Sequence, residues 1–359
     1  MRRIAFALGL AVATLTALLV GASMGAPASS TCRWSLVASL GVQRDGLFAA
    51  SAGSASSVWV VGTHWIYPNY NPSFTAPVIE YWDGRHLAAV RSPGAASVAA
   101  MGREAWTVGW NVGALTKRKG APILHWRGRR WSASANPGGP GSSLNGVAMI
   151  SPRDVWAIGS TKALIPLVLH WNGSSWSKVT APAGLGTEGT LISVARIPGT
   201  AQVWVDGIDA NASGFAARWT GSGWETYSLR YVGGRSGNLA AASSSNAWIV
   251  GEKGDNTGKI TRDVIYHWDG STWSEVPTPN PSATRNSLSG VAARTESDAW
   301  AVGNFTRGKK VHALALHWDG SKWSQVKAPG LSLTAVTTVP GTRQAWAVAA
   351  TGEIERYRC

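Results

Sequence analysis

The sequence lacks several features that mark common protein classes. Apart from one apolar run, residues 4–20, no stretch is apolar enough to cross a membrane. No linker rich in proline and serine divides the chain, and no nucleic-acid-binding motif accompanies its basic residues. The chain has only two cysteines, Cys32 and Cys359. We therefore expect a mature protein with no membrane span and no nucleic-acid partner.

Residues 1–28 have the pattern of a secretory signal peptide. Met1-Arg2-Arg3 is basic, Ile4–Val20 is apolar, and Ala26-Pro27-Ala28 fits a cleavage site with small flanking residues. The alternative is an uncleaved membrane anchor, but the apolar run is shorter than the ~20 residues that a spanning helix needs. We predict a secreted, extracellular protein whose mature part, residues 29–359, is a single domain.

The charge balance favours anionic partners. The chain has 33 Lys and Arg residues against 19 Asp and Glu residues, a formal net charge of +14. A basic secreted surface attracts anionic partners such as wall polymers, acidic polysaccharides or extracellular nucleic acid, and the last of these has no matching motif in this chain. The alternative is that the charge serves solubility alone, because the basic residues are scattered and the densest group is Lys117-Arg118-Lys119.

Tryptophan, by contrast, is abundant, with 21 residues, and most of them mark a repeated unit. Asn286–Lys327 is one copy, marked by Trp300, Trp318 and Trp323. The first of these marks recurs in each of seven units, at Trp59, Trp106, Trp156, Trp204, Trp248, Trp300 and Trp346. A repeat of roughly 40–50 residues is typical of a β-propeller.

Each unit predicts four short strands. In the copy at 286–327 these are L-S-G-V-A-A, A-W-A-V-G, L-A-L-H-W and W-S-Q-V. A D-G pair such as Asp319-Gly320 separates the third and fourth strands and is a strong hairpin signal. A chain of this length would suggest two domains, but the repeat predicts one all-β, seven-bladed β-propeller.

The two ends of the repeat array complement each other. The last unit lacks its fourth strand, and residues 32–37 match the W-S-x-V pattern of that strand. We predict that they pair with Glu353–Arg358, close the ring and remove two exposed strand edges. Cys32 and Cys359 then flank the place of the missing turn, which predicts a disulfide. The alternative is two free thiols.

Residues that recur in every unit are expected to serve packing. The recurring tryptophans should form the core between blades. Four histidines precede the second tryptophan of their units, and they fall in separate blades: His125, His170, His267 and His317. We therefore assign them to packing and predict neither a metal site nor a cofactor.

The unit V-W-A-V-G … L-x-L-H-W-D-G-x-x-W-S-x-V resembles the tryptophan-rich, kelch-like propeller repeat of secreted bacterial proteins, some of them galactose-oxidase-like. The resemblance covers about Cys32 to Cys359 and implies the fold, while it implies no particular activity. Galactose oxidases need a copper site with a cysteine crosslinked to a tyrosine. Both cysteines of this chain are assigned to the disulfide, so copper chemistry is not expected.

Function should reside in the loops that do not repeat. Connections between strands two and three share a face with those between strands four and one. On that face, aromatic and amide or basic side chains are the candidate ligand-binding residues: Trp65, Tyr67, Tyr70, Asn71, Trp110, Arg307 and Lys310. Exposed aromatic rings beside amides can stack on sugar rings or peptide strands. The alternative is that the first of these loops folds over its own aromatic residues.

One acidic residue breaks the repeat. Asp206 stands where other units have valine or isoleucine, and a carboxylate at a usually buried position needs a partner or performs chemistry. Further acids are expected on the same face of units four and five: Asp209, Glu252, Asp255 and Asp263. Two carboxylates could cleave a glycosidic bond. Asp206, Asp209, Glu252 and Asp255 are therefore the candidate catalytic residues.

We favour a monomeric, non-catalytic binding propeller for a carbohydrate or an anionic cell-envelope polymer. The alternatives are a polysaccharide-active hydrolase or lyase and an extracellular protein–protein scaffold. Replacing Asp206 by Asn should leave a binding protein intact and should stop turnover in the hydrolase or lyase.

Overall fold

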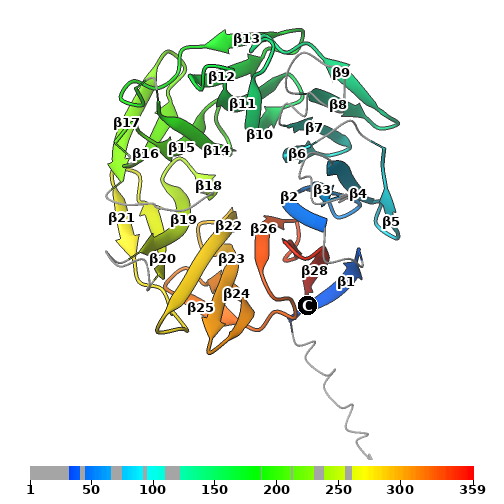
Figure 1. Cartoon of the computed structure of the whole chain (residues 1–359), viewed down its shortest axis with the longest axis vertical. Helices are drawn as coiled ribbons and strands as arrows, with labels where there is room; N and C mark the ends of the chain where they lie inside the picture. The colour runs from blue at the N-terminus through cyan, green and yellow to red at the C-terminus, as the bar shows by residue number, and fades with distance from the viewer. Residues whose placement is uncertain are drawn as a thin grey trace, which may run out of the picture. The chain divides into compact units, whose positions relative to one another are not determined.

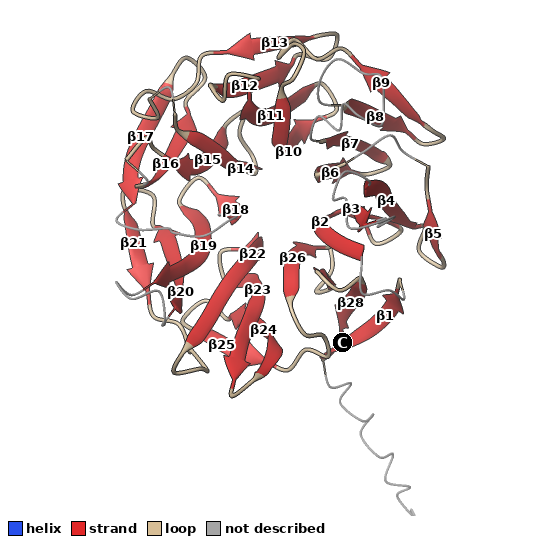
Figure 2. Ribbon diagram, in the orientation of Figure 1, coloured by secondary structure: helices blue, strands red, loops and turns tan. Residues whose placement is uncertain are grey.

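The computed structural model describes residues 32–40, 45–65, 75–91, 95–109, 122–186, 188–211, 213–229, 238–254 and 261–359. These residues form β-strands and no helix (Figure 2). They belong to one compact unit, Cys32–Cys359. The predicted all-β class is confirmed for this part of the chain. Nothing among the described residues meets the length and hydropathy of a membrane-spanning helix.

Consecutive strands form antiparallel sheets. The first sheet contains β2 (Asp45–Ser54), β3 (Ser57–Trp65), β4 (Thr75–Trp82) and β5 (Leu87–Ala89). The second contains β6 (Ser97–Met101), β7 (Glu104–Val108), β8 (Ile123–Arg127) and β9 (Trp131–Ser134). The third contains β10 (Ser143–Ser151), β11 (Asp154–Ser160), β12 (Pro166–Trp171) and β13 (Trp176–Val179). The fourth contains β14 (Thr190–Arg196), β15 (Val203–Ile208), β16 (Gly214–Trp219) and β17 (Trp224–Leu229).

The next two repeat units share one sheet. Its first part contains β18 (Asn238–Ser243), β19 (Asn246–Gly254), β20 (Thr261–Trp268) and β21 (Trp273–Val276). Its second part contains β22 (Arg285–Thr295), β23 (Asp298–Arg307), β24 (Lys310–Trp318) and β25 (Trp323–Val326). A parallel bridge between Thr261 and Arg285 joins the two parts. The last sheet combines both ends of the described chain: β26 (Leu333–Thr338), β27 (Ala345–Ala349), β28 (Glu353–Arg358) and β1 (Arg33–Ser39).

The sheets are arranged radially, with the first strand of each unit innermost (Figure 1). Strand β10 contacts β6 and β14, and β2 contacts β6 and β26. Small sheets around a common centre are the arrangement of a β-propeller. The short side chains of the inner strands, many of them alanine, suit this crowded position.

The ends of the chain meet in the last sheet. Strand β1 pairs antiparallel with β28, so that Trp34 lies opposite Tyr357. Cys32 and Cys359, which flank this pair of strands, form a disulfide. The predicted disulfide is therefore confirmed, and it joins the two strands where other units have a short turn such as Asp319–Lys322.

The recurring tryptophans fill the layers between sheets. Trp106 is 1% exposed. Its ring packs edge-on against Trp176 of the following sheet at 5.3 Å and lies 5.1 Å from Trp171. The same contact recurs between the two repeat units that share one sheet, where Trp248 meets Trp323 edge-on at 5.1 Å. The prediction that these residues form the core between sheets is confirmed.

The recurring histidines support this core. His170 Nε2 donates to Asp154 Oδ1 at 2.9 Å, and its ring lies 4.5 Å from that of Trp156. His317 makes the equivalent bond to Asp298 at 3.0 Å. The packing role predicted for these histidines is confirmed. The described residues contain no group of three or more side chains suited to hold a metal ion.

We expect the double substitution Cys32→Ser/Cys359→Ser to lower the free energy of unfolding by ~2–4 kcal/mol, because β1 is then held to β28 only by the ladder. Urea unfolding measures this loss. The wild type under reducing conditions provides the matched comparison and should lose a similar amount. Two titratable thiols in the folded native protein would contradict the bond.

Replacing Trp156 by Ala should lower the free energy of unfolding by ~3–5 kcal/mol, because Trp156 is buried between two sheets and a cavity remains. Leu36→Ala is the matched control, since Leu36 is 53% exposed and should matter by no more than about 0.5 kcal/mol. Equal losses for the two variants in chemical denaturation would refute the assignment of Trp156 to the core.

Candidate functional site

A cavity of about 490 Å³ lies at the edge of one sheet. Another cavity, of about 730 Å³, lies at the centre and is surrounded by the inner strands. We call the central one the bulge cavity. Its described lining comes from the first halves of β2, β6, β10, β14, β18, β22 and β26. None of these lining residues carries a charged side chain. Cavities with apolar walls and a few polar groups are the common form of a ligand site.

Five inner strands have the same irregularity where they enter this cavity. In each, the register with the second strand shifts across one extra residue, for example between Leu144 and Gly146. Such a bulge turns the extra side chain away from the regular alternation. The extra residues all line the cavity, and they are Phe48, Asn145, Ile192, Ser289 and Thr334.

These five residues do not stand out in the sequence as candidate site residues. The signal was present as the variable second position of the L-x-G-V-A-A strand, which is occupied by F, N, I, S and T in the five units. The leucine before it is buried in each case, as Leu144 and Leu191 illustrate. Periodicity assigns the variable residue to a strand, and only the bulge turns it toward the cavity.

The polar groups of the bulge cavity are held in place by the inner strands. Asn145 Nδ2 donates to the carbonyl of Leu191 at 3.0 Å, which fixes the amide and leaves Oδ1 as an acceptor. Thr334 Oγ1 lies 2.7 Å from the carbonyl of Leu47 and ties β26 to β2. Phe48 adds an aromatic ring to the same wall. The wall can therefore offer hydrogen bonds and an apolar surface to an uncharged ligand.

Asp206 lies behind this wall. It is 3% exposed, and its Oδ1 accepts a hydrogen bond from the backbone N–H of Ser193 at 2.8 Å. Ser193 itself lines the bulge cavity. Asp206 shares a sheet face with Trp204, two residues earlier, which packs against Trp268 of the next sheet. Burial raises the pKa of Asp206 to about 7.

The other acidic candidates lie away from the bulge cavity. Asp209 Oδ1 accepts hydrogen bonds from the backbone N–H groups of Asn211 and Ser213, each at 2.8 Å, and so stabilises the turn after β15. Glu252 lies directly opposite Asp263 on β19 and β20. Asp255 lies outside the described residues. The structure thus brings Glu252 and Asp263 together, and neither is among the described residues that line the bulge cavity.

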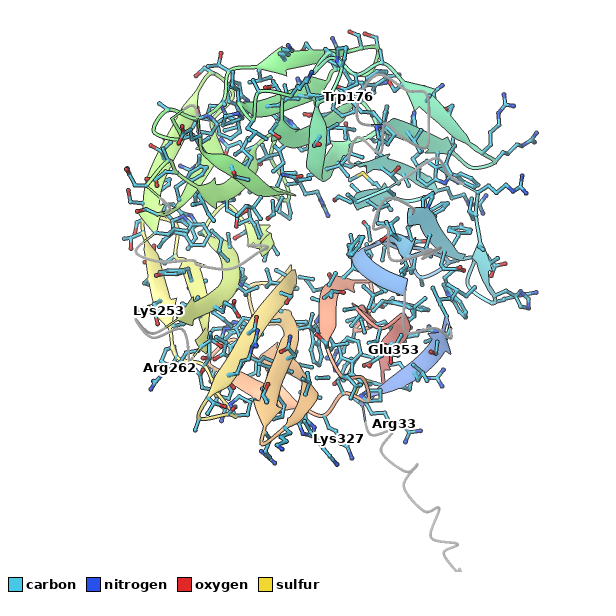
Figure 3. All side chains as sticks on the ribbon, in the orientation of Figure 1. Arg33, Trp176, Lys253, Arg262, Lys327 and Glu353 are labelled. Atoms are coloured by element: carbon cyan, nitrogen blue, oxygen red, sulfur yellow. A yellow bond between two sulfur atoms is a disulfide. The ribbon has the colours of Figure 1, made fainter. Side chains whose placement is uncertain are left out.

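Asp263 belongs to a small polar network at the edge of its sheet. It is 4% exposed, and its Oδ1 accepts from Thr278 Oγ1 at 2.9 Å. Burial raises its pKa to about 6. The neighbouring cross-strand pair, Lys253 and Arg262, is labelled in Figure 3 at the periphery of the ribbon. This network and the pair border the 490 Å³ cavity.

The predicted ligand-binding loop residues are only partly described. Arg307 and Lys310 are exposed neighbours at the tip of the β23–β24 hairpin, and the Arg307 guanidinium lies 5.8 Å from the Phe305 ring. Trp65 is the last residue of β3, opposite Thr75. The remaining candidates lie outside the described residues, namely Tyr67, Tyr70, Asn71 and Trp110.

No protein-family model and no curated protein matches this chain. Solved structures do match it. A catalytically inactive variant of virginiamycin B lyase from Staphylococcus aureus, with quinupristin, aligns with a TM-score of 0.59 and 12% identity over 91% of this chain and 99% of that chain. The RRP9 WD40 repeats align with a TM-score of 0.62 and 10% identity over 90% and 97%. U3-55K aligns with a TM-score of 0.61 and 9% identity over 91% and 98%.

These alignments cover almost all of each chain, and they show the fold alone because the identities are low. The chain is a β-propeller, as its repeat and its radial sheets indicate. The bulge cavity lies at the centre of this propeller.

Asp206 predicts an unusual pH dependence of stability. Its pKa is about 7 in the folded protein and near 4 in the unfolded chain, so the fold favours the protonated acid. The stability that it contributes is fully present below about pH 4 and is lost as the pH rises through 7. In wild type this titration should lower the free energy of unfolding by about 1–3 kcal/mol between about pH 5 and 8. Asp206→Asn cannot titrate and should lack this decrease.

Asp319→Asn is the matched control for this measurement. Hydrogen bonds from the Ser321 hydroxyl and from backbone N–H groups of the same turn lower the pKa of Asp319 to about 2, so its contribution to stability is lost only at acid pH. Urea unfolding at several pH values should show that the free energy of unfolding of Asp319→Asn changes with pH between about 5 and 8 as it does in wild type. The same pH dependence of the unfolding free energy in Asp206→Asn and in wild type would mean that Asp206 does not titrate in this range.

Proposed function

We propose that this protein is a secreted, non-catalytic binding propeller, and that its bulge cavity takes an uncharged segment of a cell-envelope carbohydrate. The observation that carries the proposal is the set of five bulge residues around one cavity. These residues differ from unit to unit while their scaffold repeats. Variation among cavity-wall residues on a repeating scaffold is expected where a protein selects a ligand.

The scaffold in this proposal is a seven-bladed ring of the tryptophan-rich, kelch-like kind, formed by residues 29–359 and closed by β1. The aromatic contacts between sheets support it. Trp300 meets Trp34 edge-on at 5.1 Å, so the sheet that contains both chain ends receives the same contact as the others. Trp346 then lies 5.3 Å from Trp82 of the following sheet.

The chemistry of the bulge cavity supports a carbohydrate ligand. A sugar ring has an apolar face and a rim of hydroxyl groups. Phe48 offers an aromatic surface, Asn145 offers an amide oxygen, and Ser193 lines the same wall. An uncharged wall favours a neutral sugar over an acidic one, while basic residues elsewhere, such as Arg307 and Lys310, can attract an anionic polymer that carries it.

Secretion is part of the proposal. The pattern of residues 1–28 supports it, and so does the disulfide between Cys32 and Cys359, since such bonds persist in oxidising compartments.

A protein partner is the second candidate, and one observation favours it. Leu164, in the connection between β11 and β12, is 71% exposed and has a left-handed backbone conformation with φ of 63°. Leucine rarely adopts this conformation, and strain of this kind is often found at functional sites. Ile165 beside it is 47% exposed. These residues belong to the face at which the inner strands begin.

The test is binding of residues 29–359 to insoluble peptidoglycan, wall polymers and polysaccharides at low and high salt. The bound fraction and the released reducing sugar are measured together. We expect saturable binding without sugar release. Phe48→Ala and Asn145→Ala should each weaken binding by about tenfold, because each removes a contact worth on the order of 1–2 kcal/mol.

Three variants separate the alternatives. Leu36→Ala removes an exposed apolar side chain far from the inner strands and should bind like wild type. Arg307→Ala/Lys310→Ala should remove only the salt-sensitive part of binding. Sugar release that stops in Asp206→Asn would instead establish the hydrolase or lyase. Neither binding nor release would leave the protein partner as the candidate.

A further inference from the structure

The bulge cavity fills one end of the space between the inner strands, which we call the central channel, and the other end has a different chemistry. A cavity of about 450 Å³ is lined by the last halves of the inner strands, and we call it the arginine cavity. It shares a narrow apolar wall with the bulge cavity, formed by Val98, Val147, Leu239, Val291 and Val336. Beyond this wall the arginine cavity is lined by two guanidinium-bearing residues, Arg196 and Arg294, and by no described acidic residue.

The two arginines differ in their partners. Arg294 Nε donates to Asp298 Oδ2 at 2.7 Å, so its charge is balanced within the protein. Arg196, at the end of β14, has no acidic partner among the described residues. Partial burial against the neighbouring strands lowers the pKa of Arg196 by desolvation, while the residue as a whole is exposed to solvent. Arg196 therefore holds an uncompensated positive charge at the opening of the channel.

Hydroxyl groups face the same cavity. Ser51 Oγ accepts the backbone N–H of Ala100 at 2.9 Å, and Thr337 Oγ1 accepts the N–H of Ala52 at 3.2 Å. A hydroxyl that accepts one hydrogen bond retains its own proton to donate. Both residues line the arginine cavity, and no acceptor for their protons is found among the described residues. The same position is alanine in other units, as at Ala148 and Ala292.

We propose that the arginine cavity binds an oxyanion, a carboxylate or phosphate group, between Arg196 and the hydroxyls of Ser51 and Thr337. The guanidinium offers parallel N–H donors that match two oxygens of such a group. The hydroxyls add donors without adding charge. This site opens at the opposite end of the channel from the bulge cavity, so it does not depend on the proposed carbohydrate ligand.

The test uses inorganic phosphate and glucuronate as probes, titrated calorimetrically into residues 29–359 at constant ionic strength set with sodium chloride. Phosphate tests a phosphate source of the oxyanion, and glucuronate tests a carboxylate source. We expect wild type to bind at least one probe with a dissociation constant below about 10 mM. Arg196→Gln should weaken that binding at least tenfold, because a charge-assisted pair is lost.

Arg153→Gln is the matched control. Arg153 is an exposed arginine in the turn between β10 and β11, and it does not line the arginine cavity. Its replacement by glutamine removes the same charge from the protein. It should bind the probe like wild type, and so should Asn145→Ala in the bulge cavity. A thermal melt of each variant verifies folding. If Arg196→Gln does not fold, Arg196→Lys takes its place, and because it keeps the charge but not the paired N–H donors it should retain only part of the binding.

Two results would overturn the proposal. One is the absence of binding of both probes to wild type. The other is binding by Arg196→Gln that equals that of wild type or of Arg153→Gln, which would mean that the net charge alone attracts the probe. Loss of envelope-polymer binding with intact probe binding would reject the proposed function and leave the oxyanion site standing.

Discussion

The contact between a buried tryptophan of one repeat unit and an aromatic pair of the next unit is the interaction on which the structure depends. Trp106 against Trp171 and Trp176 is one example, and Trp248 against Trp318 and Trp323 is another. A small sheet buries little apolar surface by itself, so it gains stability mainly from its neighbours. Large rings meet this need because each buries a large apolar area in a defined edge-to-face geometry. Histidines such as His170 then secure the tryptophan from the side.

Because the aromatic contacts of the outer strands provide most of the packing between units, the inner strands can have small side chains and line a central channel. Their small residues leave space at the centre, and the bulges turn side chains such as Phe48 and Asn145 into it. The channel has two chemically distinct ends. One presents uncharged groups, and the other presents Arg196 with two hydroxyl-bearing residues. Polar groups at both ends are positioned by bonds between inner strands, such as that from Ala52 to Thr337.

The fold could be predicted to a large extent, since strand type, turn type and disulfide pairing are local or periodic properties. The repeat of Trp156 and its equivalents places each residue in its unit, and the two cysteines flank the missing turn. The site could be predicted only in part. Asp206 was identified as an exception to the repeat, but the structure places it behind Ser193 rather than in the channel. Glu252 and Asp263 were both expected on one face, and the ladder of β19 and β20 makes them direct neighbours.

The sequence by itself determined the all-β class, the repeat and the disulfide, because periodic apolar residues and turn residues act on their own neighbourhood. Only the tertiary structure decided which residues face the central channel. A bulge shifts the alternation of side chains by one position, and its effect appears only when the inner strands from distant parts of the chain meet. For the same reason Asn145, Ile192 and Arg196 look like ordinary strand residues in the sequence, yet they line the central cavities in the folded protein.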